Sequence, residues 1–334
     1  MHGMRVLILR CGETAAKLDL PATLHHSAGV EIYDLPAVPG RGDLKFLTAE
    51  ATKLLPEDPT PSLDEIQAQP RVEHQAAPQL APQRPTMPLR IIVIGSDAAL
   101  SAVLTRLMRA DQLWPQIGFV PMLDDAFPAG ASSAAQNWSI PTEPAAALKL
   151  ALTGEVTPVP LIRNDAGQVV AGSASISQWD ASPMTGEIIV DDATLVQQDA
   201  RAATKASDGA GEKSLRQPLD YGARLVPMLD APGIAAVRAI SPVETPPTEA
   251  QNSEAQQPRR GWLGRWRKNK ASTPPVGKLN PASLVTGRAV QAGGPELAVL
   301  VDGVRSARPQ KRVTFYRHLR DLQIIRPENT SAKA

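Results

Sequence analysis

A short turn between an apolar strand pattern and a helix pattern carries residues that could do chemistry. The stretch RIIVIGSDAALSAVLTRLM passes from a β-branched run through Gly95, Ser96 and Asp97 into an amphipathic helix pattern. The first turn of a helix offers free backbone N–H groups and the positive end of the helix dipole, so a phosphate could bind there. Two interpretations of Asp97 stay open. Its carboxylate caps its own helix, or it holds Mg²⁺ against nucleotide phosphates.

Other reactive side chains are sparse. The single cysteine, Cys11, excludes intramolecular disulfides and fits a reducing compartment. The five histidines contain no metal-binding pair, and the sequence has neither a Walker A loop nor a Gly-x-Ser-x-Gly elbow. Asp302 belongs to the Asp-Gly dipeptide that follows ELAVLV, which is an ordinary turn signal.

A basic and aromatic segment, RRGWLGRWRKNK, interleaves Trp262 and Trp266 with Arg265, Arg267 and Lys268. Such charges are usually only solvated. Alternatively, the segment contacts an anionic membrane, because indoles prefer the headgroup region and each cation near such a surface contributes about 1 kcal/mol. The two tryptophans are four residues apart, so they would share one face of a helix formed on that surface.

The order of apolar patterns predicts two domains of different class. Strand and helix patterns alternate up to residue 154, which is typical of a doubly wound, mostly parallel sheet. Beyond residue 154 only short apolar runs divided by turn residues occur, and they predict an antiparallel β-sandwich. The expected strands of the first part are residues 4–9, 29–35, 89–95 and 116–122, and the expected helices are residues 44–55, 98–113 and 143–154.

These patterns set the expected domain boundaries. We predict an α/β nucleotide-binding-like domain over residues 1–154, a β-sandwich over residues 155–327 and a tail over residues 328–334. Three Pro-rich or polar stretches are predicted to be disordered insertions. They are residues 55–88, 197–217 and 241–281.

Composition and charge narrow the class of partner. The 35 Lys and Arg residues nearly balance the 34 Asp and Glu residues, so no overall field favours nucleic acid and we expect no nucleic-acid partner. No apolar run approaches the roughly 18 residues of a membrane-spanning helix. We expect a cytoplasmic protein, at most peripheral to the inner face of the membrane. Protein partners and oligomeric state stay open.

The order of these segments resembles the catalytic domain of diacylglycerol kinases, within the lipid kinase and NAD kinase-like fold. GSDAAL stands where that family has Gly-Gly-Asp-Gly-Thr, and IGFVPM, SSAAQNWSIP and AAALKLALTGEVTPVPLI follow in the family's order. The C-terminal LAVLVDGVRSARPQKRVTFYRHLRDLQIIRP is similar to the family's closing strands, which contain Asp-Gly-Glu and end in Leu-x-Val-x-x-Pro. The resemblance covers most of the chain outside the three insertions.

The resemblance implies transfer of the γ-phosphate of ATP to a lipid hydroxyl with Mg²⁺ as cofactor. Carried onto the matching positions, it makes Asp302 the general base that takes the proton from the lipid hydroxyl. It makes Asp97 a candidate Mg²⁺ ligand. The residues that it places at the nucleotide are Gly95, Ser96, Asp97, Ser132 and Ser133.

The sequence departs from the family at positions that, by the resemblance, would contact phosphate. Ala98 and Ala99 replace a glycine and a threonine, which adds a Cβ and removes a hydroxyl donor. Val304 stands at the glutamate of Asp-Gly-Glu. Losing one transition-state donor commonly costs about 10²- to 10³-fold in rate. The sequence therefore predicts a weak or lost lipid kinase, or a catalytically inactive protein of that fold that binds a ligand or partner.

Overall fold

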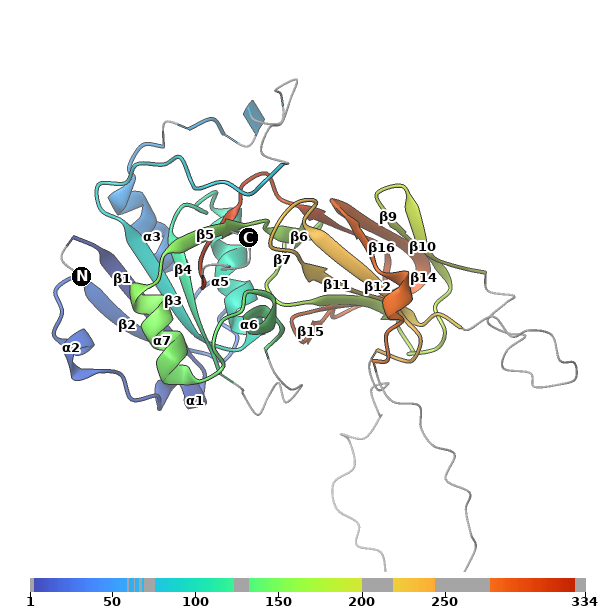
Figure 1. Cartoon of the computed structure of the whole chain (residues 1–334), viewed down its shortest axis with the longest axis horizontal. Coiled ribbons are helices and arrows are strands. Elements are labelled where there is room, and N and C mark those ends of the chain that lie inside the picture. The colour runs from blue at the N-terminus through green and yellow to red at the C-terminus, as the bar shows by residue number, and fades with distance from the viewer. Residues whose placement is uncertain are drawn as a thin grey trace, which may run out of the picture.

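The first domain is built on a mixed sheet of six strands. The computed structural model describes residues 3–58, 60–62, 64–65, 68, 76–122, 132–199, 219–243 and 277–327. In the order β2-β1-β3-β4-β17-β5, every neighbouring pair is parallel except β17 and β5 (Figure 1). The strands are β1 (Arg5–Cys11), β2 (Val30–Leu35), β3 (Leu89–Gly95), β4 (Gln116–Pro121), β5 (Val156–Val159) and β17 (Leu322–Ile325).

The central strand of this sheet, β3, is buried at every position. Its continuous β-branched run LRIIVIG suits a parallel strand that is covered on both faces. Helix α7 packs on β4, and α5 lies between β3 and the second domain, where it contacts β7. The helices are α1 (Glu13–Ala16), α2 (Ala22–His25), α3 (Lys45–Leu54), α5 (Asp97–Arg109), α6 (Ser133–Asn137) and α7 (Pro144–Thr153).

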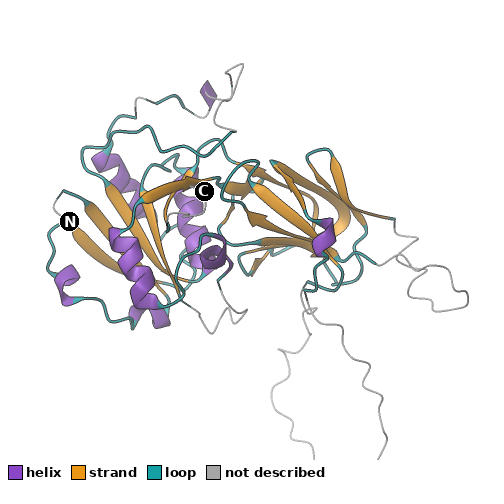
Figure 2. Cartoon of the chain, in the orientation of Figure 1, coloured by secondary structure: helices purple, strands orange, loops and turns teal. Residues whose placement is uncertain are grey.

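The second domain is one large antiparallel sheet, and Figure 2 shows its strands joined by loops, with little helix. Its long strand β14 pairs with β9 along its first half and with β8 along its second half, so two groups of strands branch from it. The strands are β6 (Ile162–Asn164), β7 (Val169–Val170), β8 (Ala174–Gln178), β9 (Gly186–Val190), β10 (Ala193–Gln198), β11 (Gly222–Pro227), β12 (Ile234–Ala239), β13 (Val285–Gly287), β14 (Ala289–Val301), β15 (Val304–Arg305) and β16 (Gln310–Arg317).

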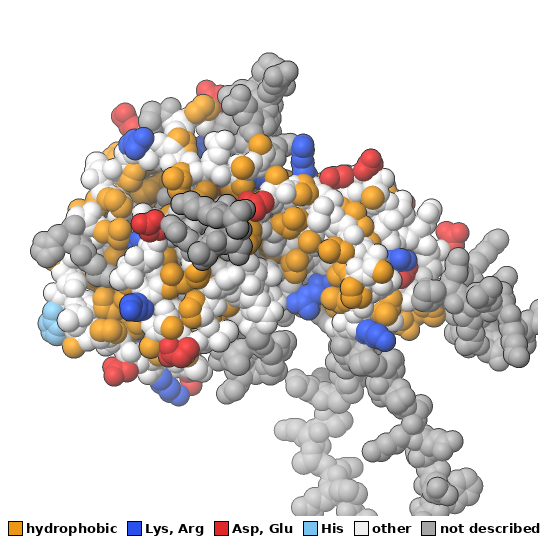
Figure 3. All heavy atoms as spheres, in the orientation of Figure 1, with side chains coloured by type: hydrophobic (Ala, Val, Ile, Leu, Met, Phe, Trp, Pro, Cys, Tyr) orange, Lys and Arg blue, Asp and Glu red, His pale blue; other side chains and the backbone are white. Residues whose placement is uncertain are grey.

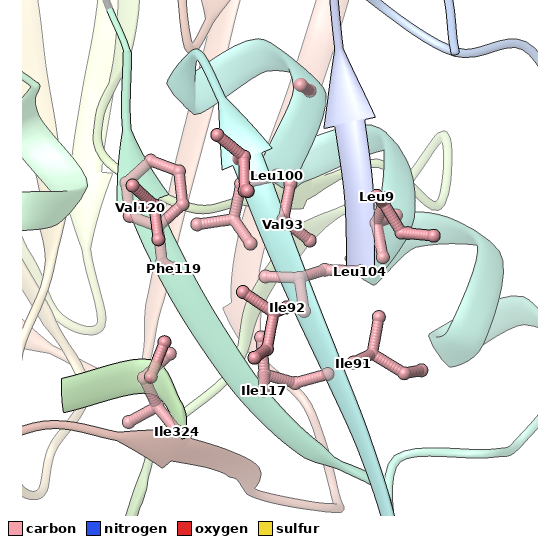
Figure 4. Packing of buried hydrophobic residues seen from close by; sticks show 14 of the residues in the cluster. Leu9, Ile91, Ile92, Val93, Leu100, Leu104, Ile117, Phe119, Val120 and Ile324 are labelled. Carbon is pink, nitrogen blue, oxygen red and sulfur yellow. The ribbon is translucent and has the colours of Figure 1, made fainter. Parts of the chain in front are cut away.

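Each domain has its own hydrophobic core. In the first domain, apolar side chains of β1, β3 and β4 pack against α5, and Figure 4 shows Ile91, Val93, Leu100 and Leu104 among them. In the second domain the core includes Ile176, on β8. The predicted fold class, an α/β domain followed by an antiparallel β domain, is confirmed.

Two strands belong to a different sheet from the one expected. We assigned residues 155–327 to the β domain, but β5 and β17 hydrogen-bond in the first sheet. All four residues of β17 are buried, because it lies inside that sheet between β4 and β5. A short apolar run does not reveal which sheet it joins. The C-terminal strand therefore returns to the first domain, where it pairs with β4 and β5.

Part of the first expected insertion lies against the sheet. Residues 76–88, which we call the proline strap, run past β17. The backbone N–H of Gln79 donates to Asp321 Oδ2 at 2.9 Å, and that of Ala81 donates to Gln323 Oε1 at 3.1 Å. The expected insertions over residues 197–217 and 241–281 lie mostly outside the described residues.

Charged groups of both signs are interspersed on the face shown in Figure 3. Within the described part of the chain, no helix is long and apolar enough to cross a membrane.

Candidate functional site

Four chain segments meet where the two domains join. They are the start of α5 at Asp97, the start of α6 at Ser132, the β7–β8 connection over residues 171–173 and the β14–β15 turn at Asp302. Figure 1 shows α5 and α6 on the side of the first domain that faces β7. The fold thus brings together most of the predicted site residues, although more than 200 positions separate Asp97 from Asp302.

The helix cap differs from the expected one. Ser96 is the N-cap of α5, and its Oγ accepts a hydrogen bond from the N–H of Ala99 at 3.3 Å. Asp97 is already the first helical residue, so the prediction that it caps its own helix is wrong. A serine hydroxyl at the N-cap makes the same bond as an aspartate would, and the dipeptide Ser-Asp allows either residue to take that place.

The carboxylate of Asp97 instead crosses to α6. Its Oδ2 accepts from the backbone N–H groups of Ser133 at 2.8 Å and Ala134 at 3.2 Å. Its Oδ1 accepts from the hydroxyl of Ser132, which also caps α6 by accepting from Ala135 N at 2.9 Å. The donors at the start of α6 are therefore satisfied by a carboxylate of the protein itself.

Asp302 stands in a two-residue turn and binds a second set of backbone donors. Its φ of 50° and the φ of 84° at Gly303 place both turn residues in the left-handed region. Its Oδ2 accepts from Ala171 N at 2.8 Å, and its Oδ1 accepts from Gly172 N at 2.7 Å and Ser173 N at 2.8 Å. The turn interpretation of Asp302 agrees with this geometry, and the carboxylate also organises the neighbouring connection.

The ionisation of Asp302 is set by opposing effects. Burial raises the pKa of its carboxyl group, and the nearby carboxylate of Asp97 raises it further, whereas the backbone donors of residues 171–173 lower it. Burial dominates, and the pKa is raised to about 7. Asp302 is therefore partly protonated near neutral pH.

This raised pKa predicts a pH dependence of stability. The contribution of Asp302 to the free energy of unfolding should be fully present below about pH 4 and fall as the pH rises towards about 7, because the folded chain keeps a proton that the unfolded chain has lost. The slope contributed by one proton is at most about 1.4 kcal/mol per pH unit. Urea unfolding of wild type and Asp302→Asn between pH 4 and 8 measures it, and the variant should lack this component. Parallel pH profiles for the two proteins would contradict the assignment.

The connection between β7 and β8 is packed too tightly to admit a side chain at Gly172. A Cβ added at Gly172 would lie 2.8 Å from Ala134 N and 2.9 Å from Ser133 Cβ. On the other side of Asp97, a Cβ at Gly95 would lie 3.0 Å from Cys11 Cβ, so this glycine serves the close approach of β1 and β3. Gly95 and Ser96 thus have structural contacts at the positions where the resemblance implies nucleotide binding.

The sequence analysis missed a cation in this cluster. Arg224 on β11 donates through Nη2 to Ser133 Oγ at 3.0 Å and to Ser173 Oγ at 3.1 Å. Among the described residues, no carboxylate lies within 4.0 Å of its guanidinium group. A single arginine in the strand pattern GARLVP gives no local signal of this role. Asn137 completes the cluster by donating through Nδ2 to Gly172 O at 2.7 Å.

The cluster does not fit Mg²⁺. A carboxylate offers about four lone-pair sites. Hydrogen bonds from the protein occupy three of them on Asp97 and three on Asp302. Mg²⁺ requires several oxygen ligands in near-octahedral geometry. Over the described ranges, no group of three or more His, Cys, Asp and Glu residues could hold a metal ion.

The sequence analysis assigned membrane contact to five residues of the basic and aromatic segment. Trp262, Trp266, Arg265, Arg267 and Lys268 lie outside the described residues.

Comparison with solved structures identifies the fold. A diacylglycerol kinase from Bacillus anthracis aligns over 98% of both chains with a TM-score of 0.52 and 11% sequence identity. A second structure from the same strain that carries the diacylglycerol kinase name aligns over 97% of both chains with a TM-score of 0.53 and 13% identity. The chain has the fold of a diacylglycerol kinase.

More remote comparisons add nothing to this assignment. An NAD kinase from Archaeoglobus fulgidus in complex with ATP aligns with a TM-score of 0.38 and 13% identity, which is too weak to support a conclusion. No protein-family model and no curated protein matches the sequence. The resemblance to diacylglycerol kinases is therefore confirmed for the fold, and at 11–13% identity it shows the fold alone.

Proposed function

We propose that this protein of the diacylglycerol kinase fold has very weak or lost phosphoryl transfer and acts as a ligand- or partner-binding module. One observation carries the proposal: the backbone donors of the candidate site are already bound by the protein's own carboxylates. Asp97 takes the N–H groups at the start of α6, and Asp302 takes those of residues 171–173. A phosphate would have to displace these carboxylates to reach the same donors.

The charge of the cluster supports the same conclusion. Phosphoryl transfer depends on positioning and on cations around the moving phosphate. Among the described residues, Arg224 is the one guanidinium group hydrogen-bonded within the cluster, through Ser133 and Ser173. The same cluster contains the two carboxyl groups of Asp97 and Asp302. One guanidinium group beside two carboxyl groups disfavours the binding of a polyanionic nucleotide phosphate.

One observation favours the competing function, a slow ATP-dependent lipid kinase. A general base works best when its pKa lies near the operating pH, and burial raises the pKa of Asp302 to about 7. In that case Asp302 would take the proton from a lipid hydroxyl, as the resemblance implies, with ATP and Mg²⁺ supplied at the Asp97 side.

A radiolabelled-ATP lipid kinase assay separates the two functions. The full chain is incubated with ATP, Mg²⁺ and diacylglycerol in vesicles, beside the Asp97→Ala and Asp302→Asn variants. We expect wild-type incorporation of phosphate into lipid to equal that of both variants. Robust wild-type turnover that both substitutions abolish would establish the slow or competent kinase instead.

We also propose that an anionic membrane surface is one partner, through the segment containing Trp262 and Trp266. Sedimentation with anionic vesicles should show binding that weakens with salt and falls in the Trp262→Ala/Trp266→Ala double variant. Equal binding by the double variant would remove the indoles from the interaction. This proposal does not depend on whether the candidate site catalyses phosphoryl transfer.

A further inference from the structure

A cavity of about 230 Å³ lies beneath the proline strap. The strap forms one wall through residues that include Leu80, Pro85 and Pro88, and the other wall includes Leu89 and Val156. Leu89 is the first residue of β3, whereas the Asp97 cluster follows the carboxyl end of that strand. The cavity is therefore separate from the candidate site, at the opposite end of the sheet.

Two hydrogen-bond donors on the cavity wall have no partner. Gln116 Oε1 accepts from Arg90 Nε at 2.9 Å and Arg90 Nη2 at 2.7 Å, and since arginine cannot accept, the amide orientation is fixed. Its Nε2 group therefore remains a donor, and no described residue accepts from it. Trp114 also lines the cavity and is 7% exposed. None of the described residues accepts a hydrogen bond from its indole N–H.

An acceptor stands on the strap. Gln83 is 8% exposed, and its Nε2 donates to Asp58 Oδ2 at 3.0 Å and Thr60 Oγ1 at 3.2 Å. These bonds orient the amide so that Oε1 is left as an acceptor. The other glutamine of the lining, Gln323, is fully used, because it accepts from Ala81 N and donates to two backbone carbonyls.

The walls carry no ionisable side chain. Leucine, valine and proline side chains supply the apolar surface, and the polar groups with unused capacity are those of Trp114, Gln116 and Gln83. Small-molecule sites combine apolar walls with a few fixed polar groups in this way. A ligand that hydrogen-bonds to these groups between the apolar walls would be fixed in one orientation.

We propose that this cavity binds a small neutral heterocycle of the nucleobase type, which presents acceptors to Trp114 Nε1–H and Gln116 Nε2–H and a donor to Gln83 Oε1. A charged ligand would enter without a counter-charge, and a pure hydrocarbon would leave the three polar groups unsatisfied. The proposal goes beyond the proposed function and does not depend on it.

Ligand-observed NMR titration of the full chain with adenine, cytosine and uracil tests the site, with benzoate and toluene as the charged and apolar probes. At least one base should bind in the millimolar range or tighter, and more tightly than benzoate and toluene. Trp114→Phe removes one donor, and Gln116→Glu removes the other while keeping an oxygen for Arg90. Each should weaken binding by about three- to tenfold. Trp138→Phe, at a buried tryptophan outside the lining, is the matched control and should bind as wild type does.

Several outcomes would overturn the proposal. They are the absence of binding by all three bases, toluene binding as tightly as the best base, and unchanged affinity in Trp114→Phe. The melting temperature of each variant is measured in parallel. If Gln116→Glu does not fold, Trp114→Phe against Trp138→Phe decides the question.

Discussion

Replacing Asp302 with alanine is expected to lower the free energy of unfolding by about 2–4 kcal/mol. The substitution leaves the N–H groups of Ala171, Gly172 and Ser173 without their acceptor. Asp302 is 7% exposed, so water does not readily replace the lost carboxylate. Urea unfolding at a fixed pH measures the loss, and Asp302→Asn, which keeps one acceptor oxygen, should lose less.

Asp191 provides a matched control for this substitution. It also occupies a hairpin turn with positive φ, 51° against 50° at Asp302, so alanine brings the same backbone strain at both positions. Its carboxylate accepts from Arg288 N and Ala289 N, but Asp191 is exposed and water can take its place. The loss in Asp191→Ala should be clearly smaller. Equal losses would mean that turn strain, and not the buried acceptor, accounts for the effect of Asp302→Ala.

The second large effect is expected for Gly172→Ala, which should cost about 1–3 kcal/mol of stability. The added methyl would press on Asp97 and on the start of α6, where a backbone nitrogen lies only 2.8 Å from the new Cβ position. Either the Asp97 carboxylate leaves its donors or residues 171–173 move away from Asp302. Both routes break hydrogen bonds between the candidate site's segments.

Gly293→Ala is the matched control for that variant. Gly293 lies in β14 of the same domain, neither glycine has a positive φ, and no atom lies within 4 Å of a Cβ added at Gly293. Thermal and urea unfolding should therefore show little change for Gly293→Ala. If Gly172→Ala is as stable as Gly293→Ala, the segments around Gly172 can move enough to accept a methyl group, contrary to this prediction.

Much of the fold follows from local sequence patterns. The run LRIIVIG predicts β3 with its observed bounds, because continuous β-branched residues suit a parallel strand buried on both faces. The α7 segment has Pro144 in its first turn and Gly154 as its C-cap, which are ordinary boundary signals. The change from mixed to β-only patterns near residue 154 predicts the change of fold class.

The sequence did not predict which sheet contains β5 and β17. The runs that form β5 and β17 are short and rich in β-branched or apolar residues, as are strands of the β domain, and only long-range pairing assigns them to the first sheet. Short apolar runs carry no information on their partner. The same limit explains why the first and last segments of the chain were expected in separate domains.

The candidate site was predicted in outline and not in its contacts. Asp97, Ser132, Ser133 and Asp302 were identified through the resemblance, and they do meet at the domain junction. Their hydrogen-bond partners could not be predicted, because residues 171–173 are an unremarkable Ala-Gly-Ser connection in sequence. Arg224 was missed for the same reason, since its role depends on serines 51 and 91 positions away.

The central claim is that the protein's own carboxylates occupy the backbone donors at which a nucleotide phosphate would bind. Isothermal titration calorimetry of the full chain with ATP and Mg²⁺ tests it most directly, with the Asp302→Asn variant in parallel. The account predicts no saturable binding of millimolar ATP at this cluster, so that wild type and Asp302→Asn give the same titration, because Asp97 and Asp302 already take the N–H groups of the cluster. Saturable one-site binding of ATP by wild type that Asp302→Asn weakens would contradict it.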